Sequence, residues 1–324
     1  MNDALLVSPF EIPTIFSIGP INVYIINAEP LTLIDTGLQN DKAETALKAG
    51  LHSLGYSMKD IQRIFITHGD YDHSGLAVKI SEASGASIYV HEMEKLKMDG
   101  WNNYISRKAD VLRAGGLPDR VFDEVVNSTQ NRVGIAQPLN EYIPLSGGEV
   151  FPFEGFDLEV FYTPGHALGH LCFFLRKQGF LFAGDTLLAH VTPNPQLEID
   201  ETAQDGRFKS LKQYMDSLDL LEKLPVKKVF TGHGRPVANI KKRIAEIREH
   251  HSRRAKRIAR ALAAKAKPMS PYQLALELYK VLDGYNNVLG VSEIWGHLDI
   301  LQEAGVIEGW TERGGHLFKT NSIK

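Results

Sequence analysis

The sequence predicts a layered α/β fold in which helices separate strands that end at a common edge. Three observations support this prediction. Short β-rich runs recur through the first 235 residues, helical segments lie between them, and five runs stop at a cluster of His or Asp with a glycine beside it. The five runs are 31–34, 64–66, 158–162, 180–182 and 229–230. Because strand ends deliver side chains to one edge of a sheet, we expect these clusters to converge.

The helices between these runs are predicted at 41–54, 75–84 and 208–223. Glycine suits tight loops in which the backbone crowds a site. It stands next to each polar cluster, as Gly37, Gly69, Gly165, Gly184 and Gly232. We therefore expect the clusters to lie in compact loops between strand and helix.

A mostly helical insertion is predicted at 92–137. The breaker Gly-Gly-Leu-Pro at 115–118 divides it, and apolar residues such as Leu112 and Phe122 lie on both sides. Two placements are open at this point. The insertion either caps the functional site or packs at the periphery.

The last third of the chain reads as a long helix followed by a small domain. From 240 to 267 apolar residues recur every three or four positions, while the other face is basic, with eleven Lys or Arg against two Glu from 241 onward. Residues 268–324 then predict helices at 271–282, 291–293 and 294–304 and a hairpin that turns at 313–315. This order is typical of a winged helix.

The composition limits the classes of function. Of 324 residues, 43% are hydrophobic and 23% charged, as in ordinary globular proteins, and the net charge of −3 gives no general attraction to nucleic acid. The one cysteine, Cys172, lies in an apolar run that predicts a buried strand. Without a signal-peptide pattern or an apolar run of about 18 residues, we expect a cytoplasmic protein with no membrane segment.

The densest polar cluster is His68-Gly69-Asp70-Tyr71-Asp72-His73, directly after a predicted strand and before a helix that should begin near 74–75. Two imidazoles and two carboxylates would repel and desolvate one another in a loop unless cations compensated them. A metal site provides that compensation. The cluster is therefore predicted to bind metal.

Three further candidate ligands follow later strands: His166, Asp185 and His233. In this order, the whole set resembles the metallo-β-lactamase superfamily over residues 5 to 250. The resemblance implies an αββα sandwich and two divalent metal ions, zinc, iron or manganese. It also implies one site built from His68, Asp70 and His166, a second from Asp72, His73 and His233, and Asp185 as the bridge. The resulting expectation is a catalytic domain at 1–239, a linker helix at 240–267 and a winged-helix domain at 268–324.

Asp70 departs from the family pattern, which usually has His at this position. As a ligand, a carboxylate favours iron or manganese more than an imidazole does. Alternatively Asp70 is a bystander in a degraded site. Because a branch of the superfamily with a carboxylate here binds two irons for redox work, a non-hydrolytic di-iron protein also stays open.

Several residues are expected around the ligands rather than among them. Asp35, at the end of an early strand, matches a family carboxylate that orients a ligand imidazole. His170 contacts substrate or supporting groups, or else stabilises its loop. His190, like His91, is expected near the pocket. The remaining histidines are expected to be structural: His52, His250, His251, His297 and His316.

The resemblance implies a hydrolase in which a metal-bridging hydroxide attacks the substrate and Asp72 aims it as a catalytic residue. Similar proteins with a C-terminal winged helix include probable thioesterases and an endoribonuclease. We expect a small-molecule acyl substrate, an ester or thioester, first. Phosphodiester cleavage in RNA comes second, and nucleic-acid regulation third. The C-terminal domain has four basic against seven acidic residues, which favours packing or homodimerisation over nucleic-acid binding.

Overall fold

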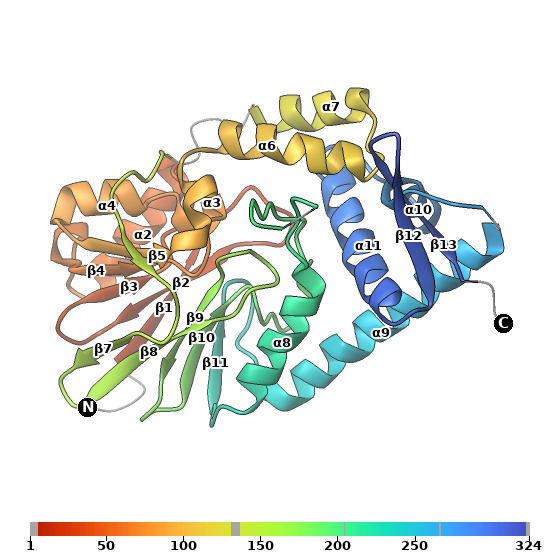
Figure 1. Ribbon diagram of the computed structural model, residues 1–324. Helices are drawn as coiled ribbons and strands as arrows, with labels where there is room; N and C mark the ends of the chain where they lie inside the picture. Colours follow the sequence, from red (N-terminus) through yellow and green to blue (C-terminus); the bar gives the residue numbers. More distant parts are fainter. Residues whose placement is uncertain (1–5, 131–136, 204, 266, 322–324) are drawn as a thin grey trace.

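The computed structural model describes residues 6–130, 137–203, 205–265 and 267–321. Two β-sheets pack face to face (Figure 1). The first has the strand order β1-β2-β3-β4-β5-β6, and its last three pairings are parallel. Its strands are Val7–Ile12, Ile21–Ile26, Thr32–Ile34, Arg63–Phe65, Ser87–His91 and Ile143–Leu145.

The second sheet has the order β11-β10-β9-β8-β7 and is antiparallel except between β10 and β11. Its strands, from β7 to β11, are Val150–Phe153, Phe156–Tyr162, Leu171–Leu175, Phe180–Gly184 and Lys228–Thr231. Every strand run predicted before a polar cluster is thus present.

Helices cover the outer faces of both sheets, which gives the expected four-layer sandwich. A mainly aliphatic cluster joins the first sheet to α2 (Asp41–Ser53) and α4 (Ala77–Ser84). A second cluster joins the other sheet to α8 (Ser210–Glu222) and the first half of α9 (Ile240–Lys265). Between the sheets lies an aromatic-rich core that includes Phe65, Phe173 and Phe182. This core holds the polar ends of the strands in fixed positions.

The insertion is helical, as predicted. It contains η2 (Glu92–Glu94), α5 (Lys95–Met98), α6 (Trp101–Ala114) and α7 (Asp119–Gln130), while its residues 131–136 lie outside the described part of the chain. Leu112, Phe122 and their neighbours share one hydrophobic cluster with the C-terminal helices. Figure 1 shows α6 and α7 extending from the sandwich to α11 and β12. The helical part of the insertion therefore packs on the C-terminal region.

The C-terminal region, residues 267–321, contains α10 (Pro271–Leu278), α11 (Asn286–Glu303) and the hairpin of β12 (Ile307–Glu312) and β13 (Gly315–Thr320). The separate helices predicted at 291–293 and 294–304 were wrong, because α11 runs through both. Two glycines face close neighbours there, since a Cβ at Gly290 would lie 2.9 Å from Leu282 and one at Gly296 would lie 3.1 Å from Leu211. They serve packing rather than a break. The predicted domain boundaries stay predictions.

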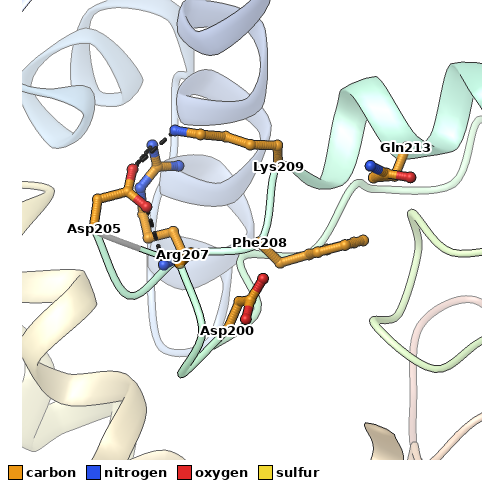
Figure 2. Close-up of a pocket in the computed structure, with 7 residues that line it drawn as sticks. Asp200, Asp205, Arg207, Phe208, Lys209 and Gln213 are labelled. Carbon is orange, nitrogen blue, oxygen red and sulfur yellow. Dashed lines mark hydrogen bonds and ion pairs between the residues drawn. The ribbon is translucent and has the colours of Figure 1, made fainter.

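A cavity of about 460 Å³ lies beside the loop that leads into α8 (Figure 2). Most of the charged side chains that line this cavity already form ion pairs with one another or with α11. Asp205 accepts hydrogen bonds from Arg207 at 3.0 Å and Lys209 at 2.8 Å, and Arg207 also binds Asp299 of α11 at 2.8 Å. These contacts fasten the loop to α11.

Across the described residues, none of the helices combines the length and apolar character needed to span a bilayer.

Candidate metal centre

The strand ends converge as predicted, but the polar cluster after β4 is not entirely a loop. A short helix, α3 (Tyr71–Ser74), already begins at Tyr71, so Asp72 and His73 lie in its first turn and Asp70 is its N-cap residue. The helix expected to start near 74–75 is α4, which begins at Ala77, and the short helix α3 before it was not predicted. Gly75 permits this tight entry, since a Cβ there would lie 2.6 Å from the Tyr71 carbonyl and 2.8 Å from that of Gly37. The backbone crowds the site here.

Four imidazoles present the same nitrogen to the centre. In each, Nδ1 faces an oxygen that can accept its proton: His68 faces Thr67 Oγ1 at 3.1 Å and His73 faces Asp35 at 2.9 Å. In the same way, His166 faces the Asn194 carbonyl at 3.0 Å and His233 that of Pro20 at 2.9 Å. The Nε2 lone pairs are therefore free to bind a metal.

Two groups of ligand atoms lie side by side. His68, His166 and Asp185 form one, and Asp72, His73 and His233 the other, with the ligand atoms of each group within 4.8 Å of one another. Asp185 touches both, because Oδ2 lies 3.7 Å from Nε2 of His166 and of His233, and Oδ1 lies 3.6 Å from His73 Nε2. The second group has the composition predicted for one site, whereas the first contains Asp185 in place of the predicted Asp70, and the roles of these residues as metal ligands stay predictions.

Unpartnered buried atoms show that the set fits a metal. His68 Nε2, His73 Nε2 and Asp185 Oδ1 are buried without a hydrogen-bond partner. Burial without a partner costs several kcal/mol per polar group, and an ion bound to these atoms would remove that cost. Gly232 keeps space open beside them, since a Cβ there would lie 2.2 Å from Asp185 Oδ1.

The electrostatics of the centre favour a cation. Burial lowers the pKa of His73, but the carboxylates of Asp35 and Asp185 outweigh burial and raise this pKa to about 10. Burial also raises the pKa of Asp185, yet the imidazoles of His233, His73 and His166 bring it down to about 2. Protons on the imidazoles thus compensate the carboxylates. A divalent ion would supply that positive charge instead.

Asp35 lies where a supporting carboxylate was predicted. One oxygen accepts the Thr67 backbone N–H at 2.8 Å, and the other accepts the His73 Nδ1–H at 2.9 Å. Its backbone adopts φ +58°, a conformation that is uncommon for residues other than glycine. The side chain thus joins the two ends of the single segment that carries His68 and His73.

His170 takes the loop-stabilising role among those left open. It is buried, and its Nε2 accepts the Asp185 backbone N–H at 3.2 Å while Nδ1 lies 3.0 Å from Thr186 Oγ1. Burial holds the pKa of His170 well below its usual value, so the ring is neutral. It positions the loop of the bridging Asp185 and does not reach solvent.

The other predicted histidines lie outside the ligand groups. His190 is exposed, with its ring against Gly234 next to the ligand His233. His91 is buried, stacks on Tyr162 and caps η2. A third buried group of His251, Glu293 and His297 lies between α9 and α11. There the two imidazoles hydrogen-bond each other at 3.2 Å and His297 Nδ1 donates to the Glu293 carbonyl at 2.6 Å, which fits the structural role expected for them.

Sequence reasoning missed a buried network around Asp70. Lys97 of α5 lies 3.0 Å from Asp70 Oδ1, and Gln196 Nε2 lies 2.8 Å from Oδ2. Glu198 binds Lys97 at 2.9 Å and accepts a 2.9 Å hydrogen bond from the Tyr104 hydroxyl. The charged stretch at 92–99 looks like a solvated surface in the sequence. Its buried partner, Glu198, is about a hundred positions away, so no local signal identifies Lys97.

Comparisons with known proteins agree with this geometry. The chain is 31% identical over 317 residues to the probable metallo-hydrolase YqjP of Bacillus subtilis (strain 168), covering 96% of each chain. It is similar to the crystal structure of the metallo-β-lactamase family protein TTHA1429 from Thermus thermophilus, with a TM-score of 0.79, 27% identity and coverage of 98% and 99%.

A more partial match is the atrochrysone carboxyl ACP thioesterase of Aspergillus fumigatus. It is 28% identical over 150 residues, which cover 46% of this chain and 43% of that protein. The sequence model of the metallo-β-lactamase superfamily matches residues 17–233, which contain every ligand in the two groups. Sheet order, ligand convergence and sequence similarity thus agree, and the chain belongs to the metallo-β-lactamase superfamily.

Proposed function

We propose that this chain is a hydrolase that holds two divalent ions, zinc, iron or manganese, and cleaves carboxylic esters or thioesters. The proposal depends above all on the position of Asp185, whose two oxygens face imidazoles of both ligand groups. Seven candidate ligands, one of which is this shared carboxylate, exceed the four that a single tetrahedral ion takes. Superfamily membership supports metal-dependent hydrolysis as the reaction class.

Each ligand residue has a defined part in this proposal. His68, Asp70 and His166 would hold one ion, and Asp72, His73 and His233 the other. When bound, the ions lower the pKa of a water molecule towards neutrality and stabilise negative charge on the substrate oxygen. Asp72 is buried beside His233, with 3.3 Å between Oδ2 and Nε2. It accepts a hydrogen bond from the attacking water and so aims it at the substrate.

A cavity supports a small acyl substrate. It has a volume of about 410 Å³, within the usual range for small-molecule sites, and lies between the insertion and residues 198–202. Lys97 and Glu198 separate it from Asp70, while Met93, Leu96 and Leu168 supply apolar wall. Six acidic and three basic side chains line it. This balance does not attract a polyanion such as RNA.

We further propose that residues 267–321 form a winged helix with a packing role. Two helices, the β12–β13 hairpin and a bridge from Met269 to Phe318 support this assignment. Most of α11 is buried, including Val291, Trp295 and Leu298. A helix that reads a nucleic-acid groove needs an exposed face, so packing against the insertion or a second copy of the chain is favoured.

The substrate class is tested by comparing kcat/KM on a panel of acyl esters and thioesters with kcat/KM on a single-stranded RNA oligonucleotide. We expect acyl substrates to react faster, and Asp72→Ala to abolish that activity and so tie it to this centre. Faster metal-dependent cleavage of RNA would replace the thioesterase proposal with a nuclease. Binding of two irons without hydrolysis of any substrate would favour a redox protein.

A further inference from the structure

The two oxygens of Asp70 face different partners. Oδ2 points towards the imidazoles, 3.5 Å from His68 Nε2 and 3.8 Å from His166 Nε2. Oδ1 accepts a hydrogen bond from the Lys97 ammonium at 3.0 Å. Gln196 Nε2 donates to Oδ2 at 2.8 Å and lies 3.3 Å from His166 Nε2. One oxygen therefore belongs to the ligand group and the other to Lys97.

Lys97 is firmly held in this position. Its side chain is only 5% exposed, and it lies 2.9 Å from Glu198 Oε1 and 3.7 Å from Glu94 Oε2. Glu94 in turn accepts the backbone N–H of Gly69 at 2.8 Å and of Gly169 at 2.6 Å. These two glycines adjoin the loops that carry Asp70 and His166. A buried ammonium with such partners is strongly favoured to stay paired.

We propose that Lys97 is a positioning residue for the metal centre. By holding Oδ1, its ammonium orients Asp70 so that Oδ2 alone faces His68 and His166, and the carboxylate joins that group as a one-oxygen ligand. This inference rests on the two-ion site of the proposed function. A carboxylate fixed before binding loses less conformational freedom when it takes a metal, so affinity rises.

The effect should be confined to one ion. Asp72, the carboxylate of the other group, lies 3.3 Å from His233, and no lysine or arginine among the described residues pairs with it. Loss of Lys97 should therefore weaken the ion at His68, Asp70 and His166. The ion at Asp72, His73 and His233 should change little.

The test is the Lys97→Met variant, titrated with manganese or zinc against a chromogenic chelator. We expect one of two binding constants to weaken by about 10- to 100-fold, the usual cost of losing a residue that supports a ligand. Lys108→Met is the matched control. Lys108 is also fully buried, and it donates to the Tyr104 hydroxyl at 2.7 Å, in the same network but away from Asp70. It should leave both constants unchanged.

A double variant shows whether Lys97 acts through Asp70. In the Asp70→Ala background, Lys97→Met should cause no further loss of affinity. If Lys97→Met does not fold, Lys97→Met with Glu198→Gln removes the unpaired carboxylate and is titrated instead. Unchanged constants, equal losses in the Lys108 control, or additive losses with Asp70→Ala would each overturn the proposal. A protein that binds two ions as expected but cleaves no acyl substrate would overturn the proposed function alone.

Discussion

At the scale of single residues, the candidate metal centre depends on side chains that are not themselves candidate ligands. Asp35 fixes the ring of His73 and the backbone of Thr67 with one carboxylate. The neighbouring Thr67 hydroxyl donates to Asp35 at 2.9 Å and can accept the proton of His68 Nδ1. One buried charge thus orients an imidazole from each ligand group.

Asp35→Asn should weaken metal binding by about 10- to 100-fold. The amide lacks the charge that holds the proton on His73 Nδ1, although asparagine tolerates the positive φ, so the fold should persist. Chelator competition measures the affinity and circular dichroism checks the fold. Asp157→Asn, which removes an exposed carboxylate on β8, is the control. Equal affinities in both variants would show that Asp35 does not orient a ligand.

Glu293 predicts a pH dependence of stability. Burial raises its pKa to about 7, against the lowering effect of Arg254, which lies 3.5 Å away. The folded state binds the proton of Glu293 more tightly than the unfolded state does. The contribution of this proton to the free energy of unfolding is therefore complete below about pH 4.5 and is lost as pH rises through 7. The loss amounts to about 3 kcal/mol for a shift of this size.

The Glu293→Gln variant should lack this component. Denaturant unfolding of both proteins between pH 5 and 8 measures it, and their free energies of unfolding should diverge with increasing pH in favour of the variant. Parallel pH profiles would mean that Glu293 titrates alike in both states. His297 and Arg254 remain in the variant, so their own effects cancel in the comparison.

The convergence of the candidate ligands was predictable from the sequence because their loops follow buried strands whose ends share an edge. Lys97 and Gln196 were not, because their place depends on a loop near 196–198 folding back onto the insertion. Local pattern gives helix or strand and says nothing of such a distant pairing. Residues that support the site through tertiary contacts are the ones the sequence leaves unmarked.

At the scale of elements, the insertion and the C-terminal region depend on each other. Leu112 of α6 and Phe122 of α7 pack in one cluster with Ile258 of α9 and Trp295 of α11. The two placements considered for the insertion, a cap over the site and a peripheral packing element, each describe a part of it. Residues 92–104 reach the network at Asp70 through Lys97 and Tyr104, while α7 and the end of α6 support α11.

Leu112→Ala should lower the free energy of unfolding by about 2–5 kcal/mol, because the side chain is fully buried and a cavity remains. The loss should also increase hydrogen exchange in α11, on the far side of the shared cluster. Val111→Ala, on the same helix but partly exposed, should cost less. An unchanged exchange rate in α11 would show that the insertion and the C-terminal region are independent.

The boundaries of elements were harder to predict than their existence. The helices at 41–54 and 208–223 agree closely with α2 and α8, because their apolar periodicity is strong. The separate helices predicted at 291–293 and 294–304 are one continuous helix, α11, which also contains Gly290 and Gly296. Glycine in a helix costs about 1 kcal/mol when exposed, but close packing on Leu282 and Leu211 offsets that cost. Tertiary contacts decide such cases.

At the scale of the whole molecule, folding gathers seven candidate ligands from loops spread over residues 68 to 233. In the unfolded chain neither group is assembled, because each group draws side chains from loops that are far apart in the sequence. Metal binding should therefore stabilise the folded state by RT ln(1 + [L]/Kd), about 4 kcal/mol when the ion is at a thousandfold excess over Kd. Removing metal leaves buried atoms such as His73 Nε2 and Asp185 Oδ1 without a partner.

We therefore expect chelation to lower Tm and reconstitution to restore it in proportion to two ions per chain. Elemental analysis of the reconstituted protein gives the stoichiometry, and calorimetry gives Tm. His233→Ala removes a ligand from one group only, so it should bind one ion fewer and recover part of the increase in Tm. The exposed His190, next to the same loop, provides the control, because His190→Ala should keep both ions. A stoichiometry that stays near one with zinc, iron and manganese alike would contradict the two-ion centre, whereas two ions without a change in Tm would mean that the unfolded chain binds the ions as tightly as the folded chain does.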